Sequence, residues 1–241
     1  MHKIDKELEA QADVKIAKVQ MGFFKTGKGQ YGEGDVFIGL TAKAIANIAK
    51  KHYSALGLAE LEDMLRSKVH EKRAVALKVL VEKYRHYAKS KDKRACEDLF
   101  SFYLKNTKWI NNWDLVDMSA PYIIGMHLLD RKDRSVLYRL ARSDSLWERR
   151  IAIVATWILI RNGQFSDTLS LSELLLGDNQ DLMHKAVGWM LREVGKRDQT
   201  LMTKFIRMHY SHISRTTLRY AIERLPEAER KDYLKGEFKQ Y

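Results

Sequence analysis

Apolar side chains recur at helical spacing through most of this chain, and sustained alternation of apolar and polar positions is absent. About a dozen such segments, each of roughly 10 to 20 residues, are separated by short polar breaks such as SKD, RSD, GDNQD and KRDQ. Proline occurs only twice, whereas Leu, Ala, Lys, Arg and Glu are abundant. The pattern predicts an all-α fold built as a string of helical hairpins.

A short motif, in which a basic residue precedes apolar or small residues, repeats along the chain. It occurs as RAVAL (73–77), RIAIV (150–154), KAVGW (185–189) and RYAIE (219–223). Successive copies begin 77, 35 and 34 residues apart, and the first spacing is close to two units if NWDLV (112–116) stands between. This period is typical of one helix pair per repeat. We therefore expect residues 1–241 to form a single HEAT-like repeat α-solenoid, with the second helix of each pair lining a basic concave face.

Residues 25–35, KTGKGQYGEGD, are the exception, because they hold four glycines and no helical periodicity. The spacing of a phosphate-binding loop is missing, and no strand precedes the segment. With Phe23 and Phe24 before it and Tyr31 inside it, a mobile basic loop here could contact a nucleic-acid backbone. The alternative is a plain connector.

The charge balance favours a polyanionic partner. Lys and Arg number 43 against 31 Asp and Glu, which gives a net charge of +12. The segments 83–94 and 131–150 concentrate this excess, with six basic residues to one acid and seven to three. A clustered excess of this kind is typical of proteins that bind nucleic acid, although solvated helix surfaces would also account for it.

Neither a membrane nor an oxidising compartment is indicated. The most hydrophobic stretch, IAIVATWILI (151–160), is about half the length of a membrane span. The N-terminal residues MHKIDKELEAQ lack the apolar run of a signal peptide, and the single Cys96 cannot form an intrachain disulfide. We expect a cytoplasmic monomer.

Helical phase predicts a basic stripe on the segment 181–197. A step of about 100° per residue puts four residues on one face and a core set on the other. The first set, called the basic stripe, is Lys185, Trp189, Arg192 and Lys196; the second is Val187, Met190, Leu191 and Val194. An indole flanked by cations on the solvent side fits nucleic acid, and a Trp that covers a neighbouring repeat is the alternative.

Arg150 is the odd residue in a second segment, WERRIAIVATWILIRN (147–162), which is apolar nearly all round. Such a helix should be buried between its neighbours. A guanidinium in its first turn therefore needs a carboxylate or a bound phosphate as its partner.

The stretch NNWDLVD (111–117) puts two acids and an indole at the start of a helix. If Asn112 caps the helix, Asp114 lies in the first turn, where the helix dipole favours a carboxylate. Asp117 lies one turn beyond Trp113, so the two share a face. Pro121 cannot donate to the carbonyl of Asp117, which predicts a kink. Taken alone, these residues could all be structural.

Other chemistries find little support. The eight His residues show no HExxH or comparable ligand pattern, and a lone Cys gives no zinc site. Nucleophile motifs such as GxSxG are absent. We expect no metal and no cofactor.

The order NWDLVD, WERRIA and HKAVGWMLRE on HEAT-like helix pairs resembles the AlkD-like DNA alkylation repair family. The resemblance implies a monofunctional DNA glycosylase that wraps duplex DNA and releases 3-methyladenine and 7-methylguanine without base flipping. It implies that Asp117, Trp113 and Trp189 are catalytic, that Arg150 contacts a phosphate, and that Phe23 is the aromatic residue approaching the lesion strand. Lys185, Arg192 and Lys196 are further candidates for DNA binding. The alternative is a non-catalytic HEAT-like module that binds DNA structures or a protein partner.

Overall fold

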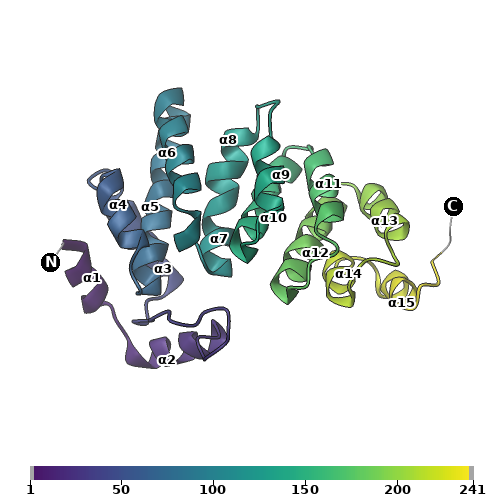
Figure 1. The fold of residues 1–241 in the computed structure, drawn as a ribbon, viewed down its shortest axis with the longest axis horizontal. Helices are drawn as coiled ribbons and strands as arrows, with labels where there is room; N and C mark the ends of the chain where they lie inside the picture. The colour runs from purple at the N-terminus through teal and green to yellow at the C-terminus, as the bar shows by residue number, and fades with distance from the viewer. Residues whose placement is uncertain (1–2, 239–241) are drawn as a thin grey trace. The chain divides into compact units, whose positions relative to one another are not determined.

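The computed structural model describes residues 3–238, and within them every regular element is a helix (Figure 1). The prediction of an all-α, solenoid-like fold is therefore confirmed. Val36 and Val69 add an isolated parallel bridge. The chain divides into two compact units, Met1–Ile123 and Ile124–Tyr241. The single domain over residues 1–241 stays a prediction.

The first unit consists of short helices around one long helix, α5. Its elements are α1 (Lys3–Ala10), α2 (Val14–Phe23), α3 (Ala42–His52), α4 (Leu58–Leu65), α5 (His70–Lys89), α6 (Lys93–Lys105), a 3-10 turn (Thr107–Trp109) and α7 (Trp113–Ala120). Helices α3 and α7 pack against α5, as do α4 and α6. The middle of α5 is the core of the unit, because Ala74 to Leu77 and Val79 to Val81 are at most 1% exposed. Burial on all sides explains why α5 has no polar stripe there.

A buried carboxylate joins the first unit's N-terminal segment to α5. Glu71 is fully buried, and its oxygens accept hydrogen bonds from the backbone N–H groups of Ile38, Gly39 and Leu40 at 2.8 to 3.3 Å. Gly39 has φ +88°, and a Cβ there would lie 1.9 Å from the carbonyl oxygen of Asp13. Only glycine fits both the conformation and the close approach of α2.

The second unit repeats the same kind of packing. Its elements are α8 (Met126–Leu128), α9 (Ser135–Ala141), α10 (Leu146–Arg161), α11 (Ser166–Leu174), α12 (Asp181–Gly195), α13 (Gln199–Met208), α14 (Arg215–Ala221) and α15 (Glu227–Lys235). Helices α10, α12 and α14 pack in a row, with α9, α11 and α13 against them. Gly188 allows the close contact between α12 and α14, because a Cβ there would lie 2.5 Å from the Cβ of Tyr220.

The repeated motif marks the second helix of each pair, as the spacing predicts. RAVAL lies in α5, RIAIV in α10 and KAVGW in α12, and RYAIE begins in α14. NWDLV begins α7, apart from its first residue, Asn112, which is the N-cap. The prediction of one helix pair per repeat is confirmed within the residues that the structure describes.

A kink was predicted at Pro121, and the structure shows a change of helix type there. Helix α7 ends at Ala120, and Pro121–Gly125 forms a π-helical turn that continues into α8. Proline has no N–H for the carbonyl of Asp117, so the regular α-helical ladder cannot run on past this point.

Candidate active site

The N-terminus of α7 is fixed by its own cap and by the first unit's core. Asn112 is fully buried and its side-chain oxygen accepts the N–H of Trp113 at 2.8 Å, which confirms the predicted cap. The amide of Asn112 donates to Asp35 at 3.3 Å. Asp114 lies in the first turn, as predicted, and one of its oxygens is also 2.8 Å from Nε2 of His70. Asp114 therefore links α7 to α5 as well as stabilising the helix terminus.

Asp117 is half-buried and lies one turn after Trp113, so both side chains belong to the same face of α7. Its charge acts on the neighbouring core. Burial raises the pKa of Tyr103, a hydrogen bond with Ser119 lowers it, and the negative charge of Asp117 raises it further. Tyr103 is fully buried, so the structure places a neutral phenol beneath the carboxylate-bearing turn.

Trp113 packs on one side of a cluster of rings, which we call the aromatic cluster. Its indole stacks on Phe24 at 5.3 Å between centroids, Phe24 stacks on Phe37 at 4.9 Å, and Phe37 stacks on His70 at 4.5 Å. The rings of Phe24 and His70 are also only 5.1 Å apart, so Phe24, Phe37 and His70 form a compact triangle. The aromatic cluster holds the indole in one orientation through apolar burial and ring packing.

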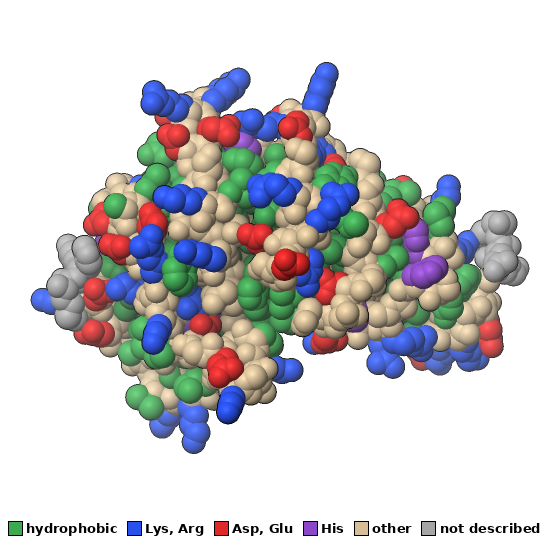
Figure 2. Space-filling view, in the orientation of Figure 1, with side chains coloured by type: hydrophobic (Ala, Val, Ile, Leu, Met, Phe, Trp, Pro, Cys, Tyr) green, Lys and Arg blue, Asp and Glu red, His purple; other side chains and the backbone are tan. Residues whose placement is uncertain are grey.

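Phe23 meets the edge of the same indole. Its ring centroid is 5.7 Å from that of Trp113 with an interplanar angle of 75°, and its side chain is 63% exposed. Val14, Lys15, Lys18 and Val19 of α2 are exposed as well. Hydrophobic and basic side chains project together at the bottom of the view in Figure 2, where Figure 1 places α2. The structure thus puts Phe23 beside Trp113.

The glycine-rich segment 25–35 is folded against Trp113. Neither the mobile basic loop nor the plain connector considered from the sequence included this contact. Its turns are closed by hydrogen bonds from Gly32 N–H to the Lys25 carbonyl (3.1 Å) and from Gly29 N–H to Glu33 (2.7 Å). Its Tyr31 hydroxyl accepts the indole N–H of Trp113 at 3.2 Å. Sequence reasoning noted Tyr31 but could not place it, because no periodicity specifies these turns.

A buried ionic network adjoins the aromatic cluster through His70. Asp35 pairs with Arg73 at 2.7 Å and is 3.3 Å from Nδ1 of His70. Burial by itself would raise the pKa of Asp35, but His70 and Arg73 outweigh it and hold the pKa below its usual range. Burial would likewise lower the pKa of His70, but Asp114 and Asp35 raise it. Sequence reasoning did not single out His70, Arg73 or Asp35.

In the second unit, the phase predicted for α12 is confirmed. Trp189 is half-buried, whereas the residues predicted for the core are at most 1% exposed: Val187, Met190, Leu191 and Val194. The cations of the basic stripe have carboxylate partners that the sequence analysis did not weigh. Lys185 pairs with Asp181 at 2.7 Å, Lys196 with Glu193 at 2.5 Å, and Arg192 with Glu223. The stripe is therefore less positive than its lysines and arginine alone suggest.

Arg150 is the fifth residue of α10, just past its first turn, and is 5% exposed, which confirms its predicted burial. Its guanidinium donates to the carbonyl of Leu182 at 2.6 Å. That carbonyl belongs to the first turn of α12, so Arg150 ties the N-terminal parts of these two helices together. The carboxylate or phosphate partner expected from the sequence stays a prediction.

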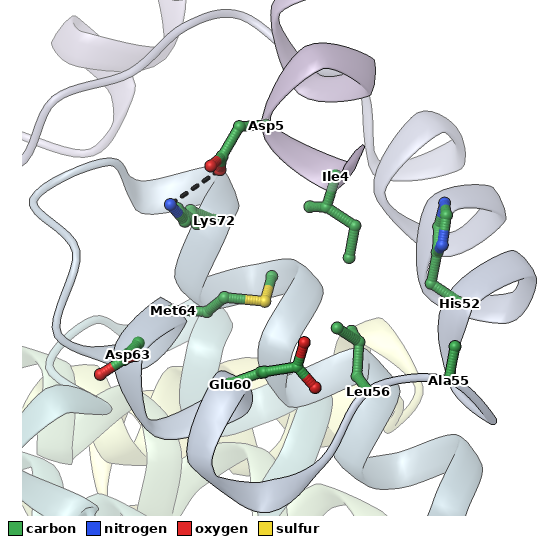
Figure 3. Close-up of a pocket in the computed structure, with 9 residues that line it drawn as sticks. All are labelled: Ile4, Asp5, His52, Ala55, Leu56, Glu60, Asp63, Met64 and Lys72. Atoms are coloured by element: carbon green, nitrogen blue, oxygen red, sulfur yellow. Dashed lines mark ion pairs between the residues drawn. The ribbon is translucent and has the colours of Figure 1, made fainter. Parts of the chain in front are cut away.

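A separate cavity of about 200 Å³ lies in the first unit, away from the residues predicted from sequence. Its lining combines apolar side chains from α1, α4 and the connection between α3 and α4 with an ion pair of 2.7 Å between Asp5 and Lys72 (Figure 3). Within residues 3–238, no group of three or more His, Cys, Asp or Glu could hold a metal ion. Over the same range, no helix is long and apolar enough to cross a membrane.

These features define an all-α repeat protein in which a half-buried carboxylate and a fixed indole share one face of a repeat helix. A family model described as DNA alkylation repair enzyme matches residues 4–225, so the chain belongs to the DNA alkylation repair enzyme family. A solved structure described as a predicted DNA alkylation repair enzyme from Enterococcus faecalis is similar, with a TM-score of 0.68 and 15% identity. The match covers 90% of this chain and 98% of that one, and at this identity it concerns the fold. A search of curated proteins finds no match.

Proposed function

We propose that this family member is a monofunctional DNA glycosylase that hydrolyses the N-glycosidic bond of cationic alkylpurines, such as 3-methyladenine and 7-methylguanine, in duplex DNA without base flipping. The observation that carries the proposal is that Asp117 and Trp113 share one face of α7, with the indole held by the aromatic cluster. The family membership supports an enzyme of DNA alkylation repair.

The chemistry suits a single carboxylate. An alkylated purine already carries positive charge, so it leaves as a neutral base when the C1′–N bond breaks and its electron pair goes to the base. The sugar is left as an oxocarbenium-like cation. Asp117 stabilises that cation and accepts a proton from the water that attacks C1′. No general acid is needed.

The aromatic and basic residues take supporting roles. Trp113 and Trp189 present indole rings to the deoxyribose and its developing charge, as cation–π attraction favours. Phe23 contacts the lesion strand beside Trp113. Arg150, together with Lys185, Arg192 and Lys196 of the basic stripe, contacts DNA phosphates, which position the duplex without reading its sequence.

Release of free base from methylated duplex DNA tests the proposal. We expect the wild-type protein to release 3-methyladenine and 7-methylguanine well above the spontaneous rate. Asp117→Asn should abolish most of this release while DNA binding, measured by fluorescence anisotropy, stays within about twofold. Asp98→Asn on α6, an exposed carboxylate of the same unit, is the matched control. Binding without any release would instead support the non-catalytic DNA-binding module.

A further inference from the structure

Tyr31 lies between two groups of the candidate site and bonds to both. Its hydroxyl accepts the indole N–H of Trp113 at 3.2 Å and donates to the backbone carbonyl of Phe23 at 3.4 Å. A phenol has one proton and two lone pairs, so it can make both bonds at once. The carbonyl thereby sets the direction of the O–H, which leaves an oxygen lone pair for the indole.

The contacts around Trp113 restrict how the indole can meet a ligand. Phe24 covers a face of the ring, Phe23 meets its edge, and Tyr31 occupies its N–H. The indole is nevertheless only half-buried. What remains for a ligand is therefore exposed ring surface rather than a hydrogen-bond donor.

The glycine-rich segment is built in a way that holds Tyr31 in this place. A Cβ at Gly32 would lie 2.4 Å from the Phe24 carbonyl oxygen, so the turn after Tyr31 packs closely against the backbone at the end of α2. Gly29 and Gly34, on either side, have φ of +75° and +87°, which favour glycine. At its end, Asp35 enters the buried network with Arg73 and His70. Both ends of the segment are thus anchored in the first unit.

From this geometry we infer that Tyr31 is a positioning residue for the proposed excision reaction. Its hydroxyl fixes the Trp113 indole so that exposed ring surface, and not the N–H, faces the deoxyribose of the lesion. The inference rests on the proposed function. It gives the segment 25–35 a role in the rate of the chemical step rather than in the affinity for DNA.

The first arm of the test compares Tyr31→Phe with wild type in single-turnover release of 7-methylguanine. The change removes one hydroxyl and keeps the half-buried ring. We expect the rate to fall about tenfold, because a loosened group near the reacting atoms loses alignment. The dissociation constant for the same duplex should stay within about twofold. Tyr53→Phe is the matched control, since the Tyr53 hydroxyl makes no hydrogen bond within residues 3–238 and should leave the rate unchanged.

The second arm shows whether Tyr31 acts through Trp113. In a Trp113→Phe background, the added Tyr31→Phe change should lower the rate by less than about twofold, because the indole N–H is already gone. The Trp113 indole N–H resonance in isotope-labelled Tyr31→Phe should also shift, whereas Tyr53→Phe should leave it in place.

Four outcomes would decide against the inference. A wild-type rate in Tyr31→Phe, or an equal loss in both backgrounds, would overturn it while leaving the glycosylase proposal intact. An unmoved Trp113 resonance would show that the hydroxyl does not hold the indole. Absence of release by the wild-type protein would overturn the proposed function, and this inference with it.

Discussion

Trp113 and Trp189 are held in different ways by their surroundings, which we call the first region around Trp113 and the second region around Trp189. Trp113 is fixed by side chains remote in sequence, of which Tyr31 lies 82 residues earlier. Trp189 stands in the middle of α12, where the buried Met190 and Leu191 set the phase of the helix. The first indole thus depends on a long-range assembly, whereas the second follows from the amphipathic pattern of its own helix.

Because of this difference, separate substitutions should displace the two indoles independently. Changes in the glycine-rich segment or its anchors should displace the Trp113 indole while α7 persists, because α7 has its own cap at Asn112. Trp189 should move only when α12 itself moves, for example when its contact with α14 is overpacked. The environment of Trp113 and that of Trp189 can therefore be tested separately.

The largest loss of stability is expected at Glu71, whose carboxylate holds the backbone of residues 38–40 in the first region. Glu71→Ala leaves the N–H groups of Ile38, Gly39 and Leu40 without their carboxylate. Since each buried donor left unpaired is costly, we expect unfolding free energy to fall by about 3 kcal/mol. Urea denaturation followed by circular dichroism measures it. Glu173→Ala, at an exposed site on α11, should stay within about 0.5 kcal/mol of wild type. Equal stabilities for the two variants would refute the role of Glu71.

A smaller loss of stability is expected at the close contact between α12 and α14 in the second region. Gly188→Ala brings a methyl group within 2.6 Å of the Thr217 carbonyl oxygen and forces α12 and α14 apart. Overpacking of this kind should destabilise the protein by about 2 kcal/mol. Gly22→Ala on α2 is the opposite case, because nothing lies within 4 Å of the added Cβ, and it should stabilise by about 0.5 kcal/mol. Thermal unfolding of both variants would show the contrast, and a shift in the same direction would contradict it.

The first region should also respond to pH through His70. Asp35 and Asp114 face its two ring nitrogens, Arg73 lies nearby, and the pKa of His70 is raised because the two carboxylates outweigh burial. The stabilisation from the charged imidazole is complete below the unfolded-state pKa of about 6.5 and is lost as pH rises through the folded-state value.

We therefore expect unfolding free energy to decrease as the pH is raised above about 6.5, and this step to vanish in His70→Asn. Denaturant titrations across that range would measure both. His86→Asn, at an exposed histidine on α5, should keep the step. Persistence of the wild-type slope in His70→Asn would show that another group titrates.

Local rules predicted the second region well and, in the first region, the start of α7. Helical phase assigned the core of α12, and the preference of Asn for the N-cap located the start of α7. Both rest on a period or cap that a few neighbouring residues determine. The pairing of Lys185 with Asp181 obeys the same four-residue rule and could have been anticipated. The bond of Arg192 to Glu223 could not, because that carboxylate comes from the neighbouring repeat.

The first region contains long-range contacts that such local rules do not predict. Asp114 was predicted to serve the helix terminus, and it does, but its second bond to His70 spans 44 residues. Tyr31 reaches Trp113 only because turns at Gly29 and Gly34 adopt positive φ, a conformation that glycine permits but does not require. Periodicity does not specify the direction of such a turn, so the aromatic cluster and the ionic network beside it could not be predicted from the sequence.

The smallest effect on stability is expected for a substitution in the basic stripe. The same substitution should affect DNA binding more than folding. Lys185 is partly exposed and its ion pair with Asp181 joins two residues of α12. Lys185→Gln should change stability by less than about 0.5 kcal/mol. If Lys185 contacts a phosphate, the same change should lower the slope of log binding constant against log salt by about 0.9. Arg66→Gln, which removes a pair of the same spacing on α4, is the control and should leave that slope unchanged. An unchanged slope in Lys185→Gln would mean that Lys185 does not contact a DNA phosphate.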